Sequence, residues 1–181
     1  MKKLSILFCI CLLTVAVKAQ NIFISKNTAV SFFSSTVVED IEGKSTTGNS
    51  VLDIQSKNII FKVSNTSFQF QKKLMQEHFN ENYIESDKYP FSLFKGKIKE
   101  DVDLTKDGTY NVTVAGNLSI HGVEKAYESK ATLVVEKGVI TAKTVFKVKI
   151  EDHQIKVPTL VFKNIAEFVE VRVSAVYQPK K

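Results

Sequence analysis

The sequence contains no tryptophan, only three prolines and seven glycines, and its two cysteines, Cys9 and Cys11, lie close together near the N-terminus. So little glycine and proline in 181 residues excludes collagen-like and linker-rich chains, and a hydrophobic content of 44% excludes a disordered one. The aromatic residues are instead 13 phenylalanines and five tyrosines, a set that favours β-strands. A chain of this length and composition predicts one domain with a packed core.

The first residues have the pattern of a secretory signal peptide. Two lysines follow Met1, residues 4–17 are apolar except for one serine and one threonine, and Ala19 ends a short site of small residues. We therefore expect residues 1–19 to be cleaved and residues 20–181 to form an exported, single-domain protein. The apolar run is shorter than the roughly 20 residues that a membrane span needs. A lipid anchor would need a cysteine at the cleavage point, where this chain has none.

Removal of the signal peptide changes the charge and the thiol content of the protein. It takes away three lysines and both cysteines, which leaves 22 basic against 19 acidic residues and a net charge of +3. This charge is too small and too evenly spread to predict nucleic-acid binding. Without cysteine, the mature chain has no disulfide, no thiolate metal site and no cysteine nucleophile.

Most of the mature chain alternates between apolar and polar residues, as half-buried strands do. The clearest case is residues 110–121, where one face is predicted to carry Tyr110, Val112, Val114, Gly116, Leu118 and Ile120. Residues 59–63, 144–150 and 168–177 alternate similarly, and turns with glycine at positions 108 and 138 separate strands. Many short antiparallel strands of this kind predict an all-β sandwich or a closed barrel.

One segment, residues 70–83, departs from this pattern and predicts a single amphipathic helix. Its apolar and aromatic residues recur every three or four positions, and a turn before Pro90 returns the chain to a strand. The residues that share this spacing are Leu74, Met75, His78, Phe79 and Tyr83. We expect the helix to cap an open end of the barrel or to lie across its flank.

The residues that could perform catalysis are few and scattered. The three histidines, His78, His121 and His153, have no i, i+4 partner that would place two metal ligands on one helical face. The sequence also has no nucleophile elbow, no phosphate-binding glycine loop and no zinc-protease motif. We therefore predict no enzyme and no metal site. A hydrolase or metal enzyme would require the three histidines to meet in one cleft.

The phenylalanines allow two interpretations that periodicity alone does not separate. A barrel of about eight strands has an interior just wide enough to be filled by side chains or to hold one small ligand. A packed core and a binding pocket are both lined by apolar side chains, so the same alternation of apolar and polar residues is expected for each. A packed core and an apolar binding cavity therefore both remain open at this point.

Several stretches, in order along the chain, carry a resemblance to a known family. They are S-F-F-S-S at residues 31–35 with I-E-G at 41–43, the helix at 75–78 with S-D-K-Y-P at 86–90 and F-K-G at 94–96, and F-K-V at 146–148 with Asp152, Ile155 and Pro158. The most specific is G-N-L-S-I-H-G-V-E-K at residues 116–125, similar to the pattern G-x-L-T-I-x-G-V-x-K. Over residues 22–177 the chain thus resembles the YceI-like family of secreted, lipocalin-like lipid-binding proteins. It departs from the family at residues 152–155, where D-H-Q-I lacks the usual glycine, and at Glu124, where threonine is common.

The resemblance implies an extended antiparallel β-barrel of about eight strands with one short helix. It implies a cavity that holds an isoprenoid, a quinone-like tail or a fatty acyl chain, with no catalysis, no metal and no cofactor other than that lipid. We expect the cavity to be lined by Phe33, Phe61, Phe70, Leu74, Phe79, Phe94, Val114, Leu118, Phe146 and Val148. At the mouth, we expect Tyr89, His121 and Lys125 to hydrogen-bond the head group.

The partners and location follow from the same reasoning. The expected partner is an apolar lipid, and we expect no nucleic acid. A transient membrane contact and a homodimer are left open. The family implies the periplasm of a double-membrane bacterium, with the cell surface or the medium as alternatives. The competing hypothesis is an exported interaction module whose barrel core is filled and binds no lipid.

Overall fold

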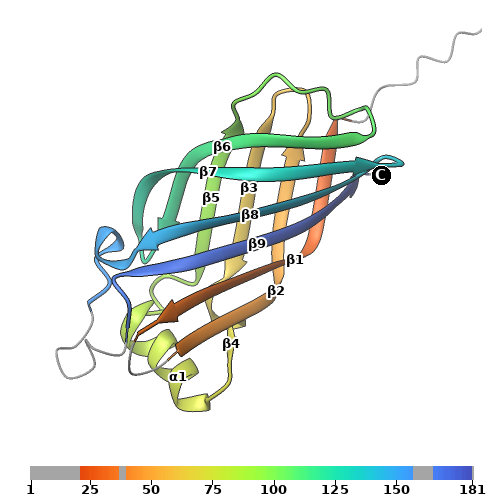
Figure 1. Ribbon diagram of the computed structural model, residues 1–181. Coiled ribbons are helices and arrows are strands. Elements are labelled where there is room, and N and C mark those ends of the chain that lie inside the picture. Colours follow the sequence, from red (N-terminus) through yellow and green to blue (C-terminus); the bar gives the residue numbers. More distant parts are fainter. Residues whose placement is uncertain (1–20, 37–39, 157–164, 181) are drawn as a thin grey trace, which may run out of the picture.

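The protein is described here by a computed structural model, which covers residues 21–36, 40–156 and 165–180 (Figure 1). The expected signal peptide at residues 1–19 and the motif residue Pro158 lie outside the described residues. The elements are β1 (Ile22–Ser35), β2 (Asp40–Asp53), β3 (Asn58–Ser64), η1 (Asn65–Ser67), β4 (Gln69–Phe70), α1 (Lys73–His78), η2 (Phe79–Tyr83), β5 (Phe91–Ile98), β6 (Gly108–Ile120), β7 (Val123–Glu136), β8 (Val139–Lys149), η3 (Ile150–His153) and β9 (Phe168–Pro179).

In the described part of the chain, eight antiparallel strands close into a barrel. The order is β1-β9-β8-β7-β6-β5-β3-β2, and β1 pairs with β2 to complete the ring, while the two-residue β4 adds to β2. Closure leaves no free sheet edge among these eight strands. The expected barrel is confirmed, and the sandwich alternative is wrong.

Side chains alternate between the barrel interior and its surface. On β6, Val112 and Leu118 are buried, as the sequence pattern predicts. Strand β9 likewise buries Ala175 and Tyr177, while Val176 between them is half exposed. The period of two along each strand therefore builds the interior face.

A β-bulge in β1 reverses this alternation partway along the strand. Asn27 has a left-handed backbone with φ of 63°, and the register with β2 shifts between Lys26 and Thr28. Buried residues occupy odd positions before the bulge, as at Phe23, and even positions after it, as at Val30. An extra residue on one strand produces this change of face.

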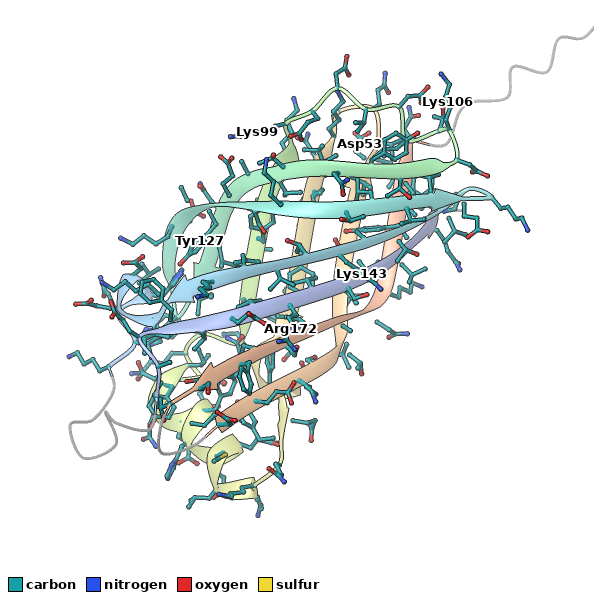
Figure 2. The ribbon with its side chains drawn as sticks, viewed as in Figure 1. Asp53, Lys99, Lys106, Tyr127, Lys143 and Arg172 are labelled. Carbon is teal, nitrogen blue, oxygen red and sulfur yellow. The ribbon has the colours of Figure 1, made fainter. Side chains whose placement is uncertain are left out.

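One end of the barrel is closed by a packed apolar cluster. Its buried members include Phe23, Leu52, Leu133 and Ile140, and Leu104 from the β5–β6 connection joins them. Figure 2 places Asp53, Lys99 and Lys106 at this end, opposite the helix. Hydrocarbon therefore fills this end of the barrel.

The helical segment covers the other end (Figure 1). Phe79, at the junction of α1 and η2, is buried and stacks on Phe32 of β1 with ring centroids 5.3 Å apart. Phe68 and Phe70 complete the aromatic cluster, with centroids 5.5 and 5.1 Å from that of Phe79. The predicted helix is confirmed as α1, and η2 continues it with wider, π-helical turns. Among the described residues, no helix combines the length and apolar character that crossing a membrane requires.

Candidate ligand-binding cavity

A large cavity lies between the helical segment and the barrel wall. Its volume is about 240 Å³, and its walls include Val30, Phe32, Met75, Phe79 and Val171. We call it the outer chamber. One water molecule needs roughly 10–15 Å³ measured in this way, so the space is far larger than a packing defect. Among the described residues in its walls, none is an aspartate, glutamate, lysine or arginine.

A second cavity lies deeper in the barrel and is called the inner chamber. Its volume is about 100 Å³, and its walls include Phe94, Val114, Ala142, Ala175 and Tyr177. The two chambers share three wall residues, Phe61, Phe146 and Val173. The inner chamber also shares Leu133 and Tyr177 with the packed cluster, so that cluster is its floor.

Glycines explain why so many phenylalanines leave the interior open. A Cβ atom on Gly43 would lie 2.6 Å from the ring of Phe32, and one on Gly48 would lie 2.7 Å from Cε2 of Phe61. These distances are shorter than van der Waals contact. Each ring therefore occupies the space that a side chain would fill if the residue were not glycine. Rings held in this way cover the wall instead of filling the lumen.

The polar side chains of the outer chamber fall into two groups. Ser34 accepts a hydrogen bond from the backbone N–H of Ala166, and Ser92 donates to Asn65, whose amide donates to a backbone carbonyl. The side chains of His78 and Tyr83 have no hydrogen-bond partner among the described residues. His78 is exposed although it lines the chamber, so the cavity reaches solvent beside α1. Burial raises the pKa of the half-buried Tyr83, which stays a neutral hydroxyl.

The structure places eight of the ten expected cavity residues in the chamber walls. The outer chamber has Phe61, Phe70, Phe79, Leu118, Phe146 and Val148, and the inner chamber has Phe94 and Val114 with a share of Phe61 and Phe146. Their contact with a ligand stays a prediction.

Two expected wall residues, Phe33 and Leu74, line neither chamber. The bulge at Asn27 turns Phe32 inward and Phe33 outward, although the odd-numbered phase of Phe23 would have placed Phe33 inside. Leu74 is 61% exposed because α1 turns Met75 and Phe79 towards the barrel instead.

The three residues expected at the mouth also lie outside the walls of both chambers. His121 is held by two contacts: its Nε2 lies 2.9 Å from Oε2 of Glu85, and its Nδ1 lies 3.1 Å from the carbonyl oxygen of His153. A carboxylate and a carbonyl only accept hydrogen bonds, so His121 makes both contacts only with both nitrogens protonated. Tyr89 packs edge-on against the His121 ring, and Lys125 is exposed on β7.

The same polar network ties the turn after β6 to the chain that leaves the helix. Hydrogen bonds from Lys88 and then His121 hold the pKa of Glu85 below its ordinary value. His153 is fully buried, and burial lowers its pKa. Its Nδ1 donates to the carbonyl of Val123 at 3.0 Å, so its Nε2, 3.1 Å from the hydroxyl of Tyr127, accepts a hydrogen bond. These contacts support the barrel around the cavity.

The wall residues that sequence reasoning missed include Phe32, His78 and Tyr83 in the outer chamber and Ala175 and Tyr177 in the inner chamber. The spacing of Met75, Phe79 and Tyr83 was a signal for Tyr83, because positions four apart share a helical face. His78 lines the outer chamber, whereas His121 and His153 lie together in the polar network, so the three histidines do not share one cleft. Within residues 21–36, 40–156 and 165–180, no three metal-ligating side chains gather closely enough to hold an ion.

Comparison with known proteins gives a family and a set of similar folds. The family model described as the YceI-like domain matches residues 22–177. No curated protein matches the chain significantly.

Solved structures resemble the barrel at low sequence identity. A polyisoprenoid binding domain from Saccharophagus degradans, implicated in plant cell wall breakdown, has a TM-score of 0.74 at 13% identity, with 90% of this chain and 100% of that chain covered. BcnA from Burkholderia cenocepacia has a TM-score of 0.68 at 18% identity, with 82% and 95% covered. A Campylobacter jejuni YCEI protein has a TM-score of 0.62 at 18% identity, with 81% and 89% covered. At these identities the likeness shows the fold alone.

Proposed function

Because the chain belongs to the YceI-like family, we propose that it binds a long-chain apolar lipid inside its barrel. The observation that carries the proposal is the outer chamber, about 240 Å³ of space with apolar walls beneath a helix. The candidate ligands are isoprenoids, lipids with a quinone-like head and fatty acyl chains. The description of one similar fold as a polyisoprenoid binding domain favours the isoprenoid class.

The free energy of burying a hydrocarbon tail is sufficient for such binding. Each buried methylene contributes about 0.8 kcal/mol, so a ten-carbon tail contributes roughly 8 kcal/mol before costs. Lost translational freedom and ordering of the ligand remove several kcal/mol of this. For ten carbons the remainder of about 4 kcal/mol corresponds to roughly millimolar affinity, and about five further buried methylenes bring the affinity to roughly micromolar.

The head group of the lipid would lie beside α1, near His78 and Tyr83. Both side chains border the outer chamber and have hydrogen-bonding atoms without a partner in the described part of the chain. His121 already uses both ring nitrogens, which makes it unsuited to the head-group role expected from the sequence. We therefore assign that role to His78 and Tyr83.

The biological role that fits these properties is that of a carrier or store. Long-chain lipids are nearly insoluble in water, and a barrel that encloses the tail keeps the lipid in solution. The signal-peptide pattern of residues 1–19 supports export, with the periplasm as the favoured compartment. Loading would involve a transient membrane contact at the α1 end, and the proposal includes neither catalysis nor a metal.

The competing function is an exported interaction module with a filled core. It predicts a barrel packed with side chains from end to end. The two chambers, with volumes of about 240 and 100 Å³, favour the lipid-binding function instead.

Native mass spectrometry of the protein purified gently from its own host tests the proposal, followed by solvent extraction of any bound molecule. We expect an additional discrete mass that is extracted as an isoprenoid, quinone or acyl lipid. Lipid binding would be contradicted if only the mass of the free protein were observed, including after incubation with geranylgeraniol and with oleic acid. In the same assay, His78→Ala and Tyr83→Phe should weaken binding of a lipid with a polar head more than binding of the matching hydrocarbon.

A further inference from the structure

The boundary between the two chambers lies at one level of the barrel, where three strands contribute the shared wall residues Phe61, Phe146 and Val173. On β9, Val169 and Val171 line only the outer chamber, and Ala175 and Tyr177 line only the inner chamber. Strands β3 and β8 also line the outer chamber at one end and the inner chamber at the other, with Phe61 and Phe146 at the boundary. The cavity is therefore divided along the barrel axis by two aromatic side chains.

The hydroxyl groups of the inner chamber all have partners within the protein wall. Tyr177 and Ser50 share a hydrogen bond of 2.7 Å, and Ser50 also donates to the carbonyl of Ile60. Three further contacts account for the remaining hydroxyls: Thr28 with Ser25 at 2.8 Å, Ser129 with Thr144 at 2.7 Å, and Tyr127 with His153 at 3.1 Å. The charged residue in this wall, Lys143, is exposed to solvent. A ligand group in this chamber finds no unpaired hydroxyl, so the site suits hydrocarbon and disfavours a polar head.

This difference between the chambers gives a bound lipid one orientation. The outer chamber borders His78 and Tyr83, whose hydrogen-bonding atoms have no partner in the described part of the chain, and it reaches solvent beside α1. The inner chamber ends on the packed apolar floor. The polar end would face α1, and the end of the tail would face Tyr177.

The strand geometry gives the length of the two compartments. Val169 and Tyr177 are eight residues apart on β9, which corresponds to roughly 26 Å along the strand at 3.3 Å per residue, and to roughly 20 Å along the barrel axis because barrel strands tilt by about 40°. Val169 and Val173, which bound the outer chamber on this strand, are separated by about 13 Å. A tail confined to the outer chamber thus has half the path of a tail that continues to the floor.

Resting on the proposed function, we propose that the inner chamber binds the end of the lipid tail, and that Phe61 and Phe146 determine which chain lengths reach it. Short tails end in the outer chamber. Longer tails pass between the two rings and bury their last carbons against Ala142, Ala175 and Tyr177. The protein therefore prefers long chains up to the length at which the tail meets the floor.

The variant Ala142→Phe tests this subsite because it fills the inner chamber from β8 and leaves the outer chamber unchanged. Ala142 lines only the inner chamber, whose volume is about 100 Å³. The matched control is Val145→Phe on the same strand, where the side chain points outward and is 55% exposed. Both variants place one additional ring on β8, but only the first places it on a ligand path.

The probes are geraniol, with ten carbons, and geranylgeraniol, with twenty, measured by titration with native mass spectrometry. The wild type should bind geranylgeraniol more tightly than geraniol. Ala142→Phe should lose about tenfold or more of its geranylgeraniol affinity, the loss expected when two or more methylenes stay unburied, while geraniol affinity remains unchanged. Val145→Phe should match the wild type for both lipids. Retained geraniol binding also reports that the variant is folded, and Ala142→Leu is the smaller replacement if the ring prevents folding.

The outcomes separate the two proposals. If Ala142→Phe binds both alcohols as the wild type does, or loses both equally, the inner chamber is not a tail subsite, although lipid binding stands. If the wild type binds neither alcohol nor the oleic acid tested above, both proposals are wrong.

Discussion

Acidification should destabilise the protein through His153. This side chain is fully buried, and its ring stacks on Tyr127 with centroids 5.8 Å apart. Burial lowers its pKa, because the charged form would leave water for the protein interior. Its two nitrogens are already assigned as donor to Val123 and acceptor from Tyr127, an arrangement that the neutral ring satisfies completely.

The sign of the pH dependence follows from proton binding in the two states. In the unfolded chain a histidine takes up its proton near pH 6.5, whereas folded His153 does so only at lower pH. Above the unfolded pKa neither state is protonated, and the full stability is present. As the pH falls below about 6.5, the unfolded state binds one proton more, and this group lowers the free energy of unfolding by up to about 1.4 kcal/mol per pH unit.

Nearby charged groups also respond to pH, so the measurement needs a variant that isolates His153. His121 lies close by, with its ring nitrogens against Glu85 and the carbonyl of His153. Asp152 and Lys125 influence His153 with opposite signs. The variant His153→Gln removes the titrating ring and keeps an amide donor and acceptor, and it leaves these other groups in place.

The assay is urea unfolding of the wild type and His153→Gln from about pH 7.5 to about pH 5. Near neutrality the variant should be less stable by about 1–3 kcal/mol, because the amide replaces a stacked, doubly hydrogen-bonded ring imperfectly. This difference should shrink as the pH falls, since only the wild type carries the penalty of the buried histidine. The control is the same substitution at the exposed His78, which should leave the profile of the wild type unchanged. A wild-type-minus-variant difference that stays constant across this range would refute the reasoning.

Three further substitutions test the cavity, the core and the surface. Gly43→Ala should push the ring of Phe32 into the outer chamber, since the new Cβ would lie 2.6 Å from it. The variant should bind lipid measurably more weakly in a titration, and overpacking should cost about 1–3 kcal/mol of stability. An unchanged lipid affinity would show that the ring relaxes elsewhere. Leu133→Ala, at a residue 1% exposed in the packed end, should cost about 2–5 kcal/mol in urea unfolding. Leu74→Ala, at a leucine 61% exposed, should change stability by less than about 0.5 kcal/mol, and a similar loss at both leucines would contradict the assigned burial.

The strand faces were predictable where alternation is uninterrupted. Along β6 the period of two identified Val112, Val114 and Leu118 as interior residues, and the structure places them there. The pattern failed at β1, where a bulge at Asn27 exchanged the two faces and brought Phe32 inward in place of Phe33. A bulge depends on the register with the neighbouring strand, which the local sequence does not contain.

The polar residues were less predictable than the apolar ones. His121 stands in the most specific family-like stretch, yet its nitrogens contact Glu85 and the carbonyl of His153, residues distant in sequence. His78 has no such contact with any residue that the structure describes, and it borders the cavity. The side chain of histidine has the same chemistry at position 78 as at position 121. Whether its nitrogens are free therefore depends on the residues that the fold places around it.

The all-β class, the helix, the family and most of the inward-facing residues could be predicted from the amino-acid sequence, because these depend on local periodicity and on the order of motifs along the chain. The packing of the strands was needed to find that the interior is open, that it is divided at Phe61 and Phe146, and that His78 and Tyr83 border one end. The physical reason is that a cavity is the volume left over when side chains from many strands meet. That volume depends on contacts such as the ring of Phe61 against Gly48, between residues that lie 13 positions apart and on different strands.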